Sequence, residues 1–102
     1  LFEKFDFIIT PCAPVAPFSV DLNFISEING RELDTYIDWI ANTYLVTMVG
    51  LPAASVPAGK NRRGLPIGLQ IIGQRFSEPE LLGVCKIIQK ISDIGTPHIS
   101  KF

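Results

Sequence analysis

The chain has 102 residues, of which 47% are hydrophobic and 19% charged, and its 9 Lys and Arg against 10 Asp and Glu give a net charge of −1. This composition is too apolar for a disordered chain, and the near-zero charge without a basic run argues against nucleic acid as the main partner. No apolar stretch approaches the ~20 residues that a membrane span needs, so no membrane partner is expected either.

The first predicted element is a strand over residues 5–9. Its aromatic and β-branched residues form a nearly continuous apolar run that Thr10 and Pro11 stop. Such a run is typical of a strand buried on both faces, as in a parallel or mixed sheet. Prolines then recur at a spacing of three, at Pro11, Pro14 and Pro17. They exclude a helix and a central strand here and predict an extended crossing.

A hairpin and a helix are predicted next. Asn29-Gly30 favours a two-residue hairpin turn, because both residues tolerate a positive φ. Thr35 and Asp38 resemble a capping box, which predicts a helix from Asp34 to Gly50. Apolar residues lie on all faces of this helix, so we expect it to be buried all round.

Two strands with a turn between them follow, at residues 53–56 and 67–72. The polar, glycine-flanked segment 57–64 between them predicts an antiparallel pair joined by a basic tip. Gly68 inside the second strand indicates a bulge or a close approach by other backbone. The cations of the tip are interpreted as a solvated loop: Lys60, Arg62 and Arg63.

The last predicted element is an amphipathic helix that begins after Ser77. A serine cap, an acidic first turn and a proline within that turn favour this start, and Gly95 and Pro97 end the helix. Its apolar face is expected to hold Leu81, Leu82, Cys85, Ile88 and Ile91. The order strand, hairpin, helix, strand, strand, helix predicts an α/β fold.

A search for chemistry in these residues assigns no catalytic set. No serine lies in a nucleophile elbow: Ser77 is a cap, and Ser55 is interpreted as a strand hydroxyl bonded locally. Cys12 follows a strand end, yet the only histidine is the distant His98, so Cys12 is interpreted as a buried small hydrophobe. The one-turn pair of Asp34 with Asp38 favours capping over acid–base catalysis.

Metal and disulfide chemistry are not expected. Two cysteines, Cys12 and Cys85, form neither a disulfide framework nor, with one histidine, a metal-ligand cluster. Reduced, cytoplasmic conditions are the simplest interpretation. The chain also opens with Leu1 and has its only methionine at Met48, which leads us to expect a piece cut from a larger protein.

Three motifs carry a resemblance to a known family. They are residues 6–11 (DFIITP) with the prolines after them, residues 50–59 (GLPAASVPAG) and residues 64–73 (GLPIGLQIIG), followed by Glu78 and Leu81-Leu82. In order and spacing they resemble the C-terminal part of the amidase signature family. The resemblance covers nearly the whole chain and is most specific from Gly50 to Leu82.

This resemblance implies a hydrolase of amide C–N bonds with a large α/β/α domain around a mixed, largely parallel sheet. The family uses a serine nucleophile, a bridging serine in a cis peptide and a lysine base, with no metal or organic cofactor. Those three residues lie in a Gly/Ser-rich signature that this chain lacks, so none is carried over. Residues 1–102 are interpreted as one segment, the C-terminal fragment of such a domain, inactive alone. Its expected partners are the missing N-terminal part, a small-molecule amide and, as an open alternative, a second copy in a homodimer.

The resemblance also suggests pocket residues, because the family's helix before Gly-Leu-Pro approaches the substrate. On that analogy Trp39, Ile40, Thr43 and Tyr44 line an acyl pocket, with plain core packing an equal alternative. Glutamine-dependent amidotransferases of the family place an acidic anchor in this helix. Counting back from Gly50 puts that anchor at the apolar Ile40, which weakens the amidotransferase alternative unless an alignment slip brings in Asp38.

Two further hypotheses compete with the amidase fragment. One is a non-catalytic interaction module that binds a partner through the apolar faces of the helix 34–50. The other is a thiol enzyme that uses Cys12 and His98, for which an enhanced thiol reactivity would be required.

Overall fold

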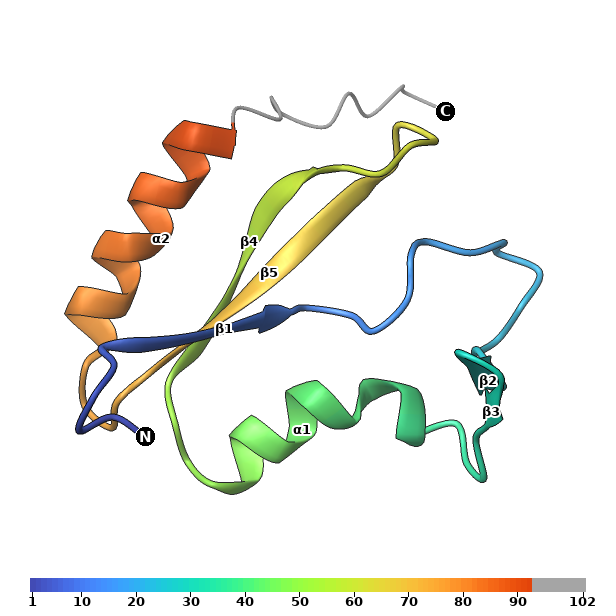
Figure 1. The fold of residues 1–102 in the computed structure, drawn as a ribbon, viewed down its shortest axis with the longest axis horizontal. Helices are drawn as coiled ribbons and strands as arrows, with labels where there is room; N and C mark the ends of the chain where they lie inside the picture. The colour runs from blue at the N-terminus through green and yellow to red at the C-terminus, as the bar shows by residue number, and fades with distance from the viewer. Residues whose placement is uncertain (93–102) are drawn as a thin grey trace.

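The computed structural model describes residues 1–92 and has the predicted order of elements (Figure 1). Its α/β fold is a three-stranded sheet, a separate small hairpin and two α-helices. The elements are β1 (Phe7–Pro11), β2 (Glu27–Ile28), β3 (Arg31–Glu32), the 3-10 helix η1 (Asp38–Ile40), α1 (Ala41–Met48), β4 (Ala53–Lys60), β5 (Pro66–Gly73) and α2 (Glu78–Ser92).

The sheet has the order β1-β5-β4, and both of its strand pairs are antiparallel. The predicted pair of strands at 53–56 and 67–72 is confirmed as β4 and β5, with β4 longer than expected. A register shift between Pro57 and Gly59 lets the strand continue past its proline. The turn between β4 and β5 is correspondingly shorter than predicted. The Asn61 Oδ1 stabilises this turn by accepting the backbone N–H groups of Arg63 and Leu65 at 2.9 and 3.0 Å.

The expected environment of the first strand is wrong for the described residues. β1 lies at the edge of an antiparallel sheet, and Ile9 is 54% exposed. Within residues 1–92 no strand pairs with its outer edge. An apolar run shows that a strand can be buried on both faces. Whether it is buried depends on which other segments pack against those faces.

One face of the sheet is covered by α2, and the core lies between them (Figure 1). Its buried residues are Val56, Ile71, Leu81 and Cys85. The predicted apolar face of the helix is wrong at two positions, because Leu82 and Ile91 are 65% and 78% exposed. Leu81, Cys85 and Ile88 pack on the sheet side as predicted, and Val84, which the prediction left out, joins them.

The start of α2 confirms the predicted position of its cap. The Ser77 carbonyl accepts the Leu81 N–H at 2.9 Å, which is the first bond of the helix. The Ser77 hydroxyl donates to the Gln74 carbonyl at 2.6 Å, so the side chain closes the preceding turn. The predicted stop at Gly95 and Pro97 lies outside the described residues.

The helix expected from Asp34 to Gly50 is shorter and less buried. It begins with η1 at Asp38, whose carboxylate accepts the Thr35 N–H at 2.8 Å, as one half of the predicted capping box requires. The N-cap itself is Ile37, which makes no side-chain cap bond, so the predicted N-cap position is wrong. It ends before Gly50, which has a φ of +66°. Leu45 and Met48 are exposed, which contradicts burial on every side. The Asn29-Gly30 turn is confirmed, with φ values of 52° and 77°.

Candidate functional site

A buried polar junction ties three elements together. The Gln70 side chain, 6% exposed, donates to the Thr10 Oγ1 at 3.1 Å and to the Asn42 carbonyl at 3.0 Å. The Asn42 Nδ2 donates to the carbonyls of Pro11 and Cys12 at 2.7 and 3.2 Å. Because neighbours along a strand face opposite ways, Gln70 points away from the α2 core that Ile71 joins. The junction therefore fixes α1 against the second face of the sheet.

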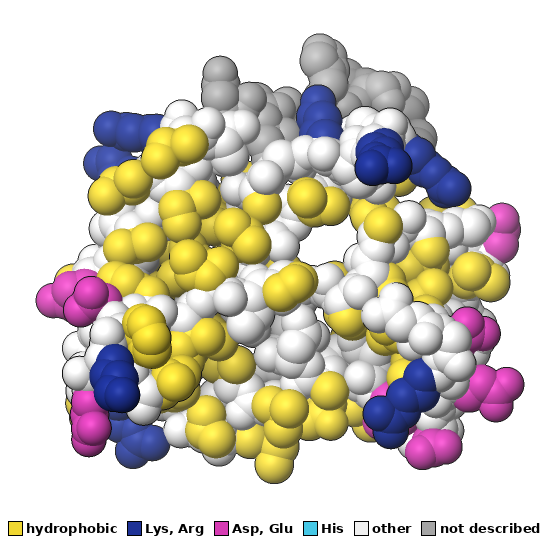
Figure 2. All heavy atoms as spheres, viewed as in Figure 1, with side chains coloured by type: hydrophobic (Ala, Val, Ile, Leu, Met, Phe, Trp, Pro, Cys, Tyr) yellow, Lys and Arg dark blue, Asp and Glu magenta, His cyan; other side chains and the backbone are white. Residues whose placement is uncertain are grey.

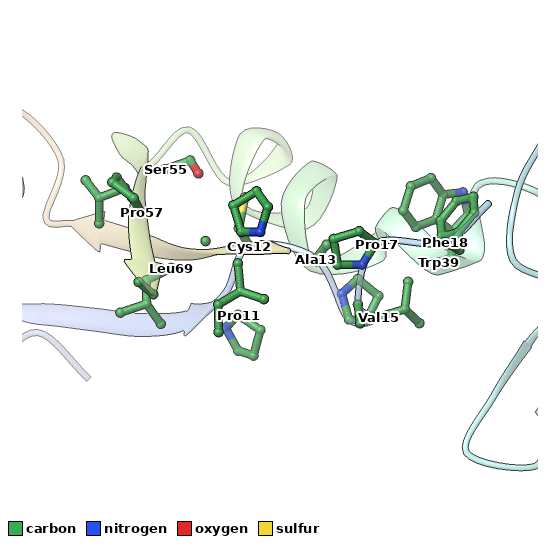
Figure 3. Close-up of a pocket in the computed structure, with 17 residues that line it drawn as sticks. Pro11, Cys12, Ala13, Val15, Pro17, Phe18, Trp39, Ser55, Pro57 and Leu69 are labelled. Carbon is green, nitrogen blue, oxygen red and sulfur yellow. The ribbon is translucent and has the colours of Figure 1, made fainter. Parts of the chain in front are cut away.

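Beside this junction lies an apolar hollow of about 800 Å³ (Figure 3). Its walls are the segment 11–18, which we call the exit segment, the β4–β5 hairpin and Trp39. Within residues 1–92 no Asp, Glu, Lys, Arg or His lines it, and the described side chains there with a polar or thiol group, besides the indole, are Ser55 and Cys12. The hollow therefore has the lining of a site for apolar groups.

Gly68 forms the floor of the hollow. A Cβ at this position would lie 3.2 Å from the Cys12 Cβ and 3.3 Å from the Ser55 Oγ. The Cys12 N–H also donates to the Gly68 carbonyl at 3.0 Å, extending the pairing of β1 and β5. The close approach predicted at Gly68 is thereby confirmed, because any side chain at this position would crowd Cys12 and Ser55.

Of the four predicted pocket residues, one lines the hollow and three do not. Trp39 lines the hollow, and its ring meets that of Phe18 edge-to-face with centroids 5.8 Å apart (Figure 3). Ile40, Thr43 and Tyr44 are half-buried and do not line the hollow. The Thr43 hydroxyl is used locally, as a donor to the Ile40 carbonyl at 2.7 Å. Contact of these four residues with a substrate stays a prediction.

The candidate nucleophiles have no catalytic partners in the part of the chain that the structure describes. Ser55 lies exposed in β4, and within residues 1–92 its hydroxyl does not make the local hydrogen bond that was expected. Cys12 is half-buried instead of fully buried, and His98 lies outside the described residues. Residues 1–92 hold no cluster of His, Cys, Asp or Glu suited to a metal ion. None of their helices is long and apolar enough to cross a bilayer.

The polar junction was missed by the sequence reasoning. A signal existed, since Gln70 is the one polar side chain within the apolar run of residues 67–72. Asn42 gave no comparable signal, because a polar residue inside the predicted helix 34–50 is ordinarily read as facing solvent. Phe18 was also missed, since nothing in the sequence shows that it meets Trp39.

Comparison with known proteins settles the family, because the Amidase family matches residues 1–82, from the start of the chain into α2. The chain belongs to the amidase family. The resemblance seen in the motifs is thereby confirmed, and the match includes both the polar junction and the hollow.

Curated relatives agree with this assignment, among them A subunits of Glutamyl-tRNA(Gln) amidotransferases. The chain is 44% identical over 81 residues to the one from Alkaliphilus metalliredigens, covering 79% of the chain and 15% of the relative. It is 42% identical over 92 residues to that of Chromobacterium violaceum, covering 90% and 18%. It is 38% identical over 97 residues to that of Psychrobacter sp., covering 93% and 18%. The chain thus spans less than a fifth of the length of these relatives.

Proposed function

We propose that this chain is the C-terminal part of a parent amidase that cleaves amide C–N bonds, with the catalytic residues in the upstream polypeptide. The family match over residues 1–82 carries this proposal. On the family's chemistry, an upstream serine attacks the amide carbonyl, and a bridging serine and a lysine move the proton. Residues 1–92 would then supply scaffold and part of the pocket wall, within a larger mixed sheet.

The open shape of the chain supports completion by further polypeptide. Its accessible surface is 8281 Å², against about 5,700 Å² for a typical monomer of 11.2 kDa. Its radius of gyration is 15.4 Å, against about 13 Å for a compact domain of this length. Figure 2 shows hydrophobic side chains gathered in broad areas of the face in view. An unpaired β1 edge and exposed apolar areas are expected in a fragment of a larger domain, where further polypeptide would pack against them.

Among amidases, the relatives favour an amidotransferase component as the parent. The curated proteins compared above are all A subunits of Glutamyl-tRNA(Gln) amidotransferases, at about 40% identity over most of the chain. Such a parent would release ammonia from an amide donor such as glutamine. We propose this as the leading assignment, with a cytoplasmic location and a small-molecule amide as substrate.

A stand-alone amidase is the second candidate, and one observation favours it. Among residues 1–92 no charged side chain lines the hollow, and the position where the family resemblance places an acidic anchor is the apolar Ile40. Both features suit an uncharged amide better than an amino-acid amide, because an unpaired charge next to apolar walls loses hydration.

The decisive experiment compares the chain with its upstream-extended parent on two substrate classes. The parent is assayed for ammonia release from glutamine and from a panel of uncharged aliphatic and aryl amides, with the 102-residue chain as control. Turnover of glutamine by the parent supports the amidotransferase component, and turnover of the uncharged amides alone supports the stand-alone amidase. Turnover by the short chain would refute the fragment proposal and turn attention to Cys12 and Ser55. No turnover by the parent would favour a non-catalytic module.

A further inference from the structure

We infer that Phe76, in the turn before α2, is the anchor of a docking face whose occupant is the segment of the parent that leads directly into Leu1. This inference rests on the proposed function, because only a longer parent chain supplies such a segment. It is carried by the backbone at Phe76, by the hollow beside its ring and by the place where the chain enters.

Phe76 has a backbone conformation that is unusual for its side chain. Its φ is +66°, in the left-handed region that glycine and asparagine enter far more readily than a bulky aromatic residue. The turn imposes this conformation, since the Ser77 N–H donates to the Gln74 carbonyl at 3.1 Å and the Arg75 guanidinium donates to the Val49 carbonyl at 3.0 Å. Residues held in such sparsely populated regions cluster at functional sites.

Within residues 1–92 the Phe76 ring gains little from packing. It is 85% exposed, more than any other aromatic side chain in this part of the chain. Glycine would adopt the same φ without the steric cost, so the phenylalanine does not serve the turn itself. Aromatic side chains are among those that contribute most of the binding energy where two polypeptide surfaces meet. A phenylalanine at this position is therefore explained by a second polypeptide surface that covers the ring.

A second hollow joins Phe76 to the start of the chain. It has a volume of about 470 Å³, and Phe2 and Phe5 line it together with residues 74–77. Figure 1 shows the N-terminus beside the connection between β5 and α2. Polypeptide that continues upstream from Leu1 in the parent therefore starts next to the Phe76 ring. The occupant is thus the segment nearest to the hollow along the parent chain.

The lining of this second hollow defines the chemistry of the occupant. Its phenylalanine rings suit an apolar side chain, and Asp6 and Glu80 add two carboxylates to the same lining. The segment should therefore carry an apolar side chain flanked by Lys or Arg, because opposite charges favour docking. A second copy of the chain fits less well. Packing the same face of two copies together would bring like carboxylates to one another.

Photo-crosslinking in the upstream-extended parent identifies the occupant. With p-benzoylphenylalanine in place of Phe76, peptide mapping by mass spectrometry should find the cross-link within about twenty residues before Leu1, since even a helix of that length spans a small domain. The matched control places the same residue at Arg62, in the exposed turn between β4 and β5, and should not cross-link to that segment.

Two substitutions separate the cost of the backbone from the role of the ring. In the 102-residue chain, Phe76→Gly removes the left-handed strain and should raise Tm by about 3 °C or more. In the parent the same change removes the anchor and should lower Tm. Phe76→Ala is the matched control, because it removes the ring but keeps the strain. It should therefore leave Tm of the short chain without an increase and lower Tm of the parent.

Several outcomes would overturn the inference. They are a cross-link to another segment or to a second copy, the absence of a cross-link, and a Phe76→Gly change that shifts Tm of both proteins in the same direction. A parent whose residues before Leu1 lack an apolar side chain beside Lys or Arg would also overturn it. None of these readouts uses turnover. The expected cross-link in an inactive parent would refute the hydrolase and keep the docking face, and an active parent without the cross-link would do the reverse.

Discussion

Asn42 holds the start of the exit segment with its Nδ2, while its Oδ1 is buried and lacks a partner among residues 1–92. Asn42→Asp replaces this donor with a carboxylate that faces two carbonyl oxygens. We expect a loss of about 2–3 kcal/mol in the free energy of unfolding, because charged acceptors would be left without donors. Urea unfolding followed by circular dichroism measures it, with Thr47→Asp on the exposed part of α1 as control. Equal losses in both variants would show that the hydrogen bonds to the exit segment contribute nothing.

Gln70 is the second residue on which the junction depends. Gln70→Met keeps the length of the side chain and removes the donor to the Thr10 Oγ1 and the Asn42 carbonyl. A loss of about 1–3 kcal/mol is expected, since two part-buried acceptors lose their donor. Gln89→Met on the exposed face of α2 is the control and should change stability by less than about 0.5 kcal/mol. A cost at position 89 as large as that at position 70 would contradict the role of the junction.

At the scale of elements, α2 shows how far the sequence pattern reaches. Leu81 and Leu82 were both assigned to the packed face, yet they are 3% and 65% exposed. Leu81→Ala should cost about 2–5 kcal/mol, because it opens a cavity against Val56 and Ile71. Leu82→Ala should cost less than about 0.5 kcal/mol. Thermal unfolding of the two variants side by side measures the difference. Similar losses of stability would show that Leu82 packs as Leu81 does, as the sequence pattern predicted.

The elements themselves were largely predictable because their signals are local. The Asn29-Gly30 turn, the stop at Gly50 and the start at Ser77 each depend on a few neighbouring residues, and the structure confirms all three positions. The periodicity placed Leu81, Cys85 and Ile88 correctly on the packed face of α2, but it could not set the width of that face or the cover of β1, since both depend on distant polypeptide.

The candidate site was less predictable than the fold for the same reason. Of the four pocket candidates, Trp39 lines the hollow, and it does so through a contact with Phe18 that lies 21 positions away. The floor was signalled by Gly68 alone, as a glycine within a strand. The polar junction depends on contacts among β1, α1 and β5. The sequence indicates it only through Gln70, a single polar residue in an apolar run.

At the scale of the whole molecule, the surface in excess of a compact monomer is about 2,600 Å², which is comparable to a permanent interface. The β1 edge adds unpaired backbone groups next to the exposed Ile9. We therefore expect the 102-residue chain alone to self-associate as its concentration rises, because burying apolar surface stabilises the associated form. Sedimentation velocity across a concentration series measures this, and the upstream-extended parent should not show the same association.

A substitution on that edge tests the cause of the association. Ile9→Lys places a charge on the β1 edge, which should reduce association while leaving the helix content unchanged. Thr47→Lys adds the same charge on α1, away from the edge, and should have a smaller effect. A short chain that stays a monodisperse monomer and melts cooperatively would show that its exposed faces need no cover. That result would count against both the fragment and the interaction module, since each requires a partner for these faces.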